Sequence, residues 1–145
     1  MPIVRLALAN LAFPRTPAAA VTGAEQAIAE AGRQGAGLVC FPECYLPGYR
    51  TAARAMAPPE AAYLEDAWTR VAAAARAAGL AVVVGTERIV NGRHRISTLI
   101  INADGSRAGF HDKVQLDPSE EPTWEAGRER HVYTAGTLTF GLAIC

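Results

Sequence analysis

Apolar residues follow two different periods along the chain. Residues 18–34, and the segment that Pro58-Pro59 opens, have apolar positions three or four residues apart, which is typical of amphipathic helices. Gly35 and Gly79 follow these segments as stop signals. Short apolar runs between turn residues are instead typical of buried strands. These runs are Ile3–Ala9, Leu38–Phe41, Leu80–Gly85, Arg95–Asn102, Arg107–His111, His131–Tyr133 and Leu138–Ile144.

The order of these elements predicts an α/β fold. Strand–helix–strand units at the start of the chain favour parallel pairing, with both helices on one face of the sheet. The turn at residues 103–106 and the later strands indicate hairpins, so we expect the sheet to be mixed. The opposite face of this sheet is also apolar and needs a cover, and we find no segment left in the sequence to provide one.

Composition narrows the class of protein. The chain has 145 residues, 50% of them hydrophobic, and 14 Lys and Arg balance 14 Asp and Glu. A net charge of zero argues against a nucleic-acid partner, and no apolar run reaches the roughly 18 residues of a membrane span. The three cysteines lack metal-ligand spacing, and the sequence shows no targeting segment. We therefore expect one domain over residues 1–145 in the reducing cytoplasm.

Three polar residues follow strand-like runs and can meet at one edge of the sheet. Glu43, Lys113 and Cys145 supply a carboxylate, an ammonium and a thiol, which together suffice for thiol-based acyl transfer. Taken singly, each also fits an ordinary role, as a loop acid, a solvated lysine and a small core residue. Their spacing alone does not decide between these interpretations.

The sequence around these residues resembles the carbon–nitrogen hydrolase (nitrilase) superfamily. Three signature blocks occur in the family's order, at residues 41–49, 112–116 and 140–145. The resemblance covers essentially the whole chain. It implies half of a four-layer α-β-β-α sandwich, with a mixed sheet and two helices on one face. Residues 1–145 would be the N-terminal portion of this domain, and the fold would need a remainder C-terminal to Cys145.

The resemblance also implies roles for individual residues. Cys145 would be the nucleophile, Glu43 the general base, and Lys113 the cation that holds the tetrahedral oxyanion. A second glutamate in the loop after the lysine would orient the substrate. Glu121 has the better spacing for this role, and Glu120 is the runner-up.

Other reactive or aromatic residues receive structural interpretations. Cys44 stands beside the expected base and is predicted to pack or to form a pocket wall. Tyr49 and Trp124 are candidates for lining the pocket or for anchoring loops. The implied mechanism needs no metal or organic cofactor. The three histidines, His94, His111 and His131, form no metal-ligand pattern.

The implied activity is cysteine-dependent hydrolysis of a non-peptide C–N bond through a thioester. Small amides, ω-amides and N-carbamoyl compounds are the expected substrates, ahead of nitriles, and the product released is ammonia or an amine. The expected assembly is a homodimer or a larger homo-oligomer. Two alternatives remain open: a non-catalytic assembly or binding fragment of the same fold, and an acyltransferase that uses the same thioester.

Overall fold

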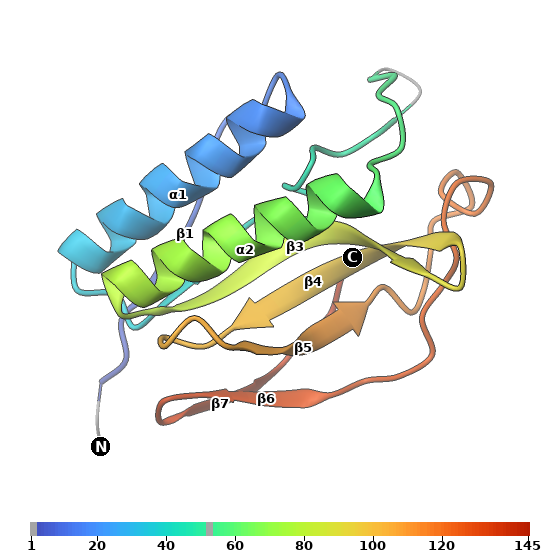
Figure 1. The fold of residues 1–145 in the computed structure, drawn as a ribbon. Coiled ribbons are helices and arrows are strands. Elements are labelled where there is room, and N and C mark those ends of the chain that lie inside the picture. The colour runs from blue at the N-terminus through green and yellow to red at the C-terminus, as the bar shows by residue number, and fades with distance from the viewer. Residues whose placement is uncertain (1–2, 52–53) are drawn as a thin grey trace.

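Five strands form one mixed sheet in the order of the sequence (Figure 1). The computed structural model describes residues 3–51 and 54–145. Strand β1 pairs in parallel with β2, and β2 pairs in parallel with β3; β4 and β5 continue the sheet as antiparallel neighbours. Their bounds are Leu6–Leu8 for β1, Leu38–Cys40 for β2, Ala81–Val90 for β3, Arg93–Ile101 for β4 and Arg107–Asp112 for β5. The predicted mixed α/β sheet is confirmed.

Two helices cover one face of this sheet, as the strand–helix–strand order predicts (Figure 1). Helix α1, Pro17–Arg33, begins at Thr16, whose side chain accepts a hydrogen bond of 3.1 Å from the amide of Ala19. Helix α2, Ala61–Ala78, ends at Gly79, whose φ of 65° is the left-handed conformation that glycine adopts at low cost. Within the part of the chain that the structure describes, neither helix combines the length and apolarity needed to cross a membrane.

The main core lies between the helices and the sheet. Trp68 of α2 contributes to it: its indole N–H donates to the Thr86 hydroxyl at 3.0 Å and its ring meets Phe110 edge-on. These contacts satisfy the one polar group that the indole carries inside the core. Other fully buried members include Ala24, Ile28, Leu64, Val71, Val82, Val84, Leu99 and Ile101.

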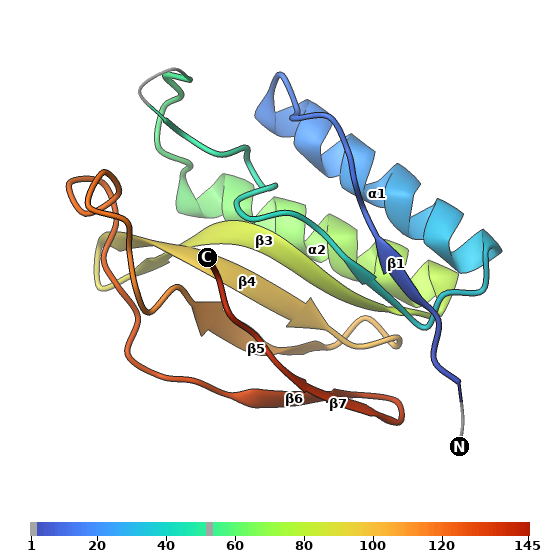
Figure 2. The ribbon, with the colours of Figure 1, turned by 180° about the vertical axis from the view of Figure 1, so that it is seen from behind.

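The last two strands form a separate antiparallel ribbon on the other face of the sheet (Figure 2). Strand β6 is Val132–Ala135 and β7 is Leu138–Gly141. The ribbon and the residue that follows it pack onto a small apolar cluster of the sheet, made of Leu38, Ala81 and Val83. The expectation that no segment could cover this face is therefore wrong for the part of the sheet under the ribbon.

The edge strand β1 is shorter than the predicted Ile3–Ala9 and remains uncovered on that same face. Ala7 packs toward the helices, whereas Leu6 and Leu8 are 52% and 80% exposed. Strand β3 is instead longer than predicted, since it continues past Gly85 to Val90 and turns into β4. Asn91 and Gly92 make this turn with φ values of 51° and 75°, as a two-residue hairpin requires.

The depth of the core predicts a large difference between two positions on α1. Ile28→Ala should lower the free energy of unfolding by about 2–5 kcal/mol, because Ile28 is fully buried and its loss leaves a cavity. Gln26→Ala, on the exposed face of the same helix, should change it by no more than about 0.5 kcal/mol. Urea unfolding curves of the two variants measure the difference, and equal losses would contradict the described packing.

Candidate active site

Glu43 follows β2 in a segment that stays beside β3. The amide of Phe41 donates to Val83 O at 2.8 Å, and the amide of Leu46 donates to Gly85 O at 3.0 Å. The amide of Glu87 closes the pairing by donating to Leu46 O at 3.1 Å. These hydrogen bonds fix the backbone on either side of Glu43 against the rigid sheet.

Gly85 makes this close approach possible. A Cβ atom at Gly85 would lie 2.0 Å from the carbonyl oxygen of Pro42 and 2.8 Å from the Cα of Glu43. Any side chain there would push the segment away from β3. The position of Glu43 therefore depends on the absence of a side chain on the neighbouring strand.

Lys113 follows β5, and its side chain is 3% exposed. Its ammonium donates to Glu43 Oε1, to Glu120 Oε1 and to the backbone oxygen of Cys145, each at 2.8 Å. An ammonium has three protons, so these bonds use its whole donor capacity. The structure thus brings the three residues singled out in the sequence, Glu43, Lys113 and Cys145, to one point.

Glu120, not Glu121, is the second carboxylate at this lysine. A turn returns the chain toward Lys113, because the amide of Glu120 donates to Asp117 O and the amide of Asp117 donates to Glu120 Oε2, both at 2.8 Å. Tyr49 also donates its hydroxyl to Glu120 Oε1. Glu121, which the spacing favours, is exposed, and the structure places the runner-up Glu120 at Lys113 instead.

The ion pairs shift the pKa values of the groups that make them. Burial alone would lower the pKa of Lys113, but hydrogen bonds and charges from Glu120 and Glu43 outweigh it and raise this pKa. Burial would raise the pKa of Glu120, but hydrogen bonds from Lys113 and Tyr49 outweigh it and lower that pKa. The ion pair of Glu120 and Lys113 therefore stabilises the fold at pH values between the pKa of Glu120 and that of Lys113. Its contribution is lost as the pH falls through the pKa of Glu120 or rises through that of Lys113.

A pocket of about 590 Å³ opens beside the lysine. Cys145 is exposed, and it lines this pocket together with Tyr49, Lys113 and Glu120. Trp124 does not line it. This residue is 5% exposed and stacks on the Tyr49 ring with a centroid separation of 5.9 Å. Of the two aromatic candidates, Tyr49 therefore reaches the pocket and Trp124 supports it from behind.

Cys44 has the packing role that the sequence suggests. Its side chain is fully buried and contributes to a cluster with Ile96 and Trp124. Burial raises the pKa of the Cys44 thiol well above its usual range, and the nearby charges of Glu87 and Glu43 raise it further. Because the thiolate is the reactive form, Cys44 is a poor nucleophile at neutral pH.

A buried carboxylate behind the site was not recognised in the sequence. Glu87 lies in β3, is fully buried, and pairs with Arg50 through two hydrogen bonds of 2.7 Å. An acidic residue inside a strand is a sequence signal for such a group. The predicted strand ended at Gly85, however, two residues before Glu87. Among residues 3–51 and 54–145, no group of three or more His, Cys, Asp or Glu side chains could hold a metal ion.

Comparison with known proteins identifies the family. The model of the carbon-nitrogen hydrolase family matches residues 5–145. The chain belongs to the carbon-nitrogen hydrolase family. An aliphatic nitrilase from Rhodococcus rhodochrous is 33% identical over 113 residues, which cover 69% of this chain and 31% of the nitrilase. The chain thus spans about a third of the length of this curated relative.

Solved structures confirm the fold that the family implies. A variant of the amidase from Nesterenkonia sp. AN1, with acrylamide added at its active-site cysteine, matches with a TM-score of 0.86 and 25% identity. The match covers 99% of this chain and 57% of the amidase chain. A glutamine-dependent NAD+ synthetase from Acinetobacter baumannii shares the fold at 20% identity, with a TM-score of 0.83 over 97% of this chain and 27% of its own. The nitrilase-like α/β fold is therefore confirmed.

The geometry predicts opposite behaviour for the two adjacent glutamates. Glu120→Gln should lower the pKa of Lys113, because one charged partner is lost while the burial remains. Glu121→Gln should leave that pKa unchanged, since this side chain is exposed. NMR titration of the side chain of Lys113, the only lysine among these 145 residues, measures both effects. A shift in the Glu121 variant alone would contradict the described turn.

Proposed function

We propose that Cys145, Glu43 and Lys113 are the catalytic groups of a cysteine-dependent hydrolase that cleaves a non-peptide C–N bond. The observation that supports this most directly is the Lys113 ammonium, bonded at once to Glu43, to Glu120 and to the backbone of Cys145. Because the relatives are longer than this chain, the proposal concerns the natural full-length polypeptide.

In the proposed reaction, the Cys145 sulfur attacks the amide carbon and Glu43 takes the thiol proton. The positive charge of Lys113 stabilises the oxyanion that forms on the former carbonyl oxygen. The C–N bond then breaks, Glu43 returns the proton to the leaving nitrogen, and an acyl thioester remains on Cys145. Water, activated by the same carboxylate, attacks the thioester and releases the acid and the thiol.

Glu120 has a different proposed role from Glu43. Both oxygens of the Glu120 carboxylate are engaged by Lys113, Tyr49 and the amide of Asp117. Its lowered pKa keeps it ionised, so it holds the lysine cation in place and does not exchange protons. In this proposal Glu120 orients Lys113 and, at the pocket, the substrate.

Small amides, ω-amides and N-carbamoyl compounds are the proposed substrates. The amidase structures support an amide, and the aliphatic nitrilase keeps a nitrile as the less favoured substrate. A pocket of about 590 Å³ suits small molecules. A homo-oligomer, a cytoplasmic location and one domain that begins with residues 1–145 remain predictions from the sequence.

Substitution of the two cysteines tests the nucleophile. Cys145→Ala should lower amide hydrolysis by at least about 10³-fold, whereas Cys44→Ala should stay within about threefold of the wild type. Ammonia release from a panel of small amides and nitriles measures both. An acyl group trapped on the Cys145 peptide would support the thioester, and loss of activity only in the Cys44 variant would refute the assignment.

The two alternatives give different results in the same assay. An acyltransferase would form product only when an acceptor other than water is supplied. A non-catalytic fragment would release no ammonia from any substrate, and its Cys145 would not react faster with an alkylating reagent than an ordinary surface thiol.

The close approach at Gly85 gives a second test. Gly85→Ala should lower kcat by about 10²-fold, because a displacement of Glu43 of about 1 Å is enough to misplace a base. Gly79→Ala is the control for backbone strain alone, since Gly79 has a positive φ, which Gly85 does not, and a Cβ at Gly79 would meet no atom within 4 Å. Steady-state kinetics of the two variants make the comparison, and equal kcat values would contradict the described role of Gly85.

A further inference from the structure

The Glu87 carboxylate is the centre of a buried polar cluster next to the candidate site. It receives two hydrogen bonds of 2.7 Å from Arg50 and one of 3.0 Å from the Trp124 indole N–H. His94 Nδ1 also lies 3.3 Å from Glu87 Oε2. Glu87 is fully buried and does not line the pocket, so it has no direct access to a substrate there.

The two residues that donate hydrogen bonds to Glu87, Arg50 and Trp124, belong to loops that hold Glu120. Arg50 directly follows Tyr49, whose hydroxyl donates to Glu120. Trp124 belongs to the turn after Glu120, and its backbone amide donates to Glu120 O at 3.0 Å. Glu87 therefore connects to Glu120 through two short routes, one in each loop.

Aromatic stacking joins these two loops to each other. The Tyr49 and Trp124 rings lie within 6° of parallel, and the Arg50 guanidinium lies 5.0 Å from the centre of the Trp124 ring. Stacked rings have a broad range of favourable geometries, so stacking alone would let one ring slide over the other. The hydrogen bonds from Arg50 and Trp124 to Glu87 are directional, and they fix the stack against β3.

We propose that Glu87 is a positioning residue: it clamps Arg50 and Trp124, and so sets the register in which Tyr49 and the turn at Glu120 hold the Lys113 ammonium. This inference rests on the proposed function, because it concerns the lysine of that same site. According to this inference, the site also requires the Glu87 carboxylate of β3, which lies behind the pocket and keeps the loops of Arg50 and Trp124 in contact. The pairing of Glu120 with Lys113 depends on that contact.

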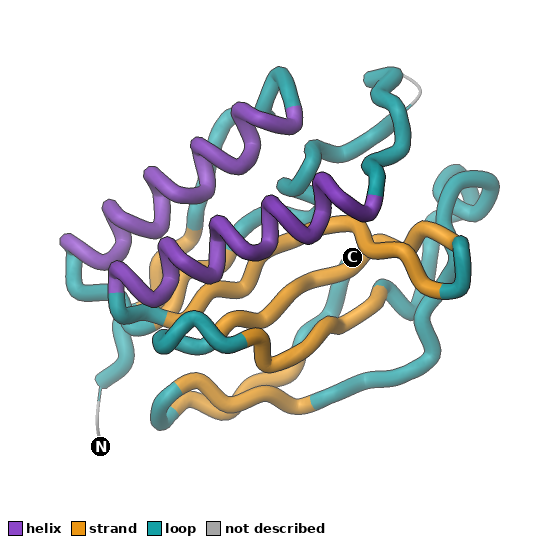
Figure 3. The backbone as a smooth tube through the Cα atoms, in the orientation of Figure 1, coloured by secondary structure: helices purple, strands orange, loops and turns teal. Residues whose placement is uncertain are grey.

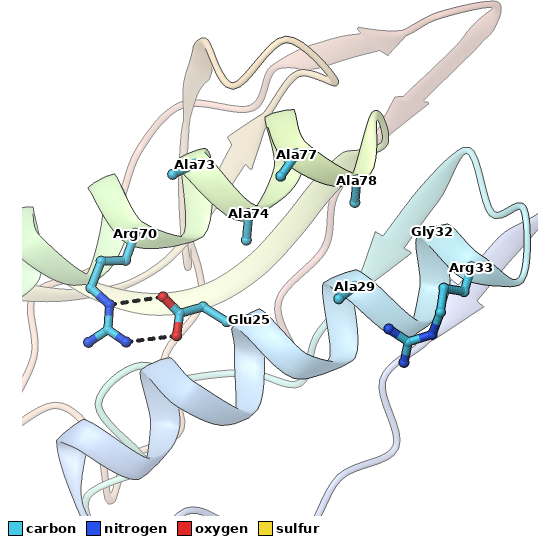
Figure 4. Close-up of a pocket in the computed structure, with 9 residues that line it drawn as sticks. All are labelled: Glu25, Ala29, Gly32, Arg33, Arg70, Ala73, Ala74, Ala77 and Ala78. Atoms are coloured by element: carbon cyan, nitrogen blue, oxygen red, sulfur yellow. Dashed lines mark hydrogen bonds and ion pairs between the residues drawn. The ribbon is translucent and has the colours of Figure 1, made fainter.

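A second glutamate–arginine pair provides a matched control. Glu25 of α1 and Arg70 of α2 make the same two-bond contact, with distances of 2.9 and 2.7 Å, in a groove between the helices (Figure 4). This groove is lined largely by alanines and includes none of the site residues. Glu25→Gln should therefore leave both kcat and the pKa of Lys113 unchanged.

The experiment is a double-mutant cycle on the natural full-length polypeptide. The four proteins are the wild type, Glu87→Gln, Glu120→Gln and the double variant, with Glu25→Gln as control. Two quantities are measured in each, namely the kinetic constants for the best amide substrate and the pKa of Lys113 by NMR titration. The second quantity needs no turnover, so it remains informative if no substrate is found.

The proposal predicts an effect of Glu87 that disappears when Glu120 is removed. Glu87→Gln should lower kcat by about 10- to 100-fold, with KM within about threefold, and should lower the pKa of Lys113. In the Glu120→Gln background it should change neither quantity, because coupled residues do not contribute independently.

Other outcomes would overturn it. If Glu87→Gln leaves kcat and the pKa of Lys113 at wild-type values, or lowers kcat by the same factor in both backgrounds, Glu87 does not act through Glu120. If the wild type hydrolyses neither amides nor nitriles, the proposed function fails, and the pKa of Lys113 still decides the role of Glu87.

A milder variant is needed in case Glu87→Gln does not fold, since that change leaves the partly buried Arg50 cation without its carboxylate. Trp124→Phe keeps the stack on Tyr49 and removes only the indole N–H that binds Glu87. It should lower kcat and the pKa of Lys113 in the same direction but less strongly. Wild-type values of both would overturn the proposal.

Discussion

The described site depends on the burial of a single ammonium group. Lys113 is 3% exposed and exchanges hydration for three hydrogen bonds, two of them to carboxylates. A buried cation with fewer partners would destabilise the fold or lose its proton. Three segments far apart in the sequence must therefore end at one nitrogen atom. This requirement explains why the loops after β2 and β5 are held so firmly.

The strand β3 supplies the platform for both loops. Gly85 allows the segment that carries Glu43 to lie against the strand, and Glu87, two residues on, binds one side chain from each loop. Figure 3 shows the long loop after β5 beside the turn that joins β3 to β4, and the amide of Glu125 donates there to His94 O at 2.9 Å. Sheet residues thus hold the loops that carry the site in place, as preorganised sites require.

Much of this arrangement could be predicted from the sequence. The periodicity of apolar residues indicates the strands and helices, and the three signature blocks that carry Glu43, Lys113 and Cys145 follow strands. The choice between Glu120 and Glu121 could not, since it depends on how the turn at Asp117 closes. The hairpin at Asn91 and Gly92 carried a clear local signal that was missed. The place of β6 and β7 had no such signal, because a short apolar strand does not specify which sheet it joins.

The two carboxylates at Lys113 differ in their exposure and in the number of hydrogen bonds that they accept. Glu120 is 4% exposed and accepts three hydrogen bonds, so its ionised form is strongly favoured and its lone pairs are engaged. Glu43 is 29% exposed, and within the described residues its side chain accepts one hydrogen bond, from Lys113. It therefore keeps an oxygen available for a proton. In the proposed reaction Lys113 binds both carboxylates, and their different environments give them different roles: Glu120 positions the lysine and Glu43 acts as the base.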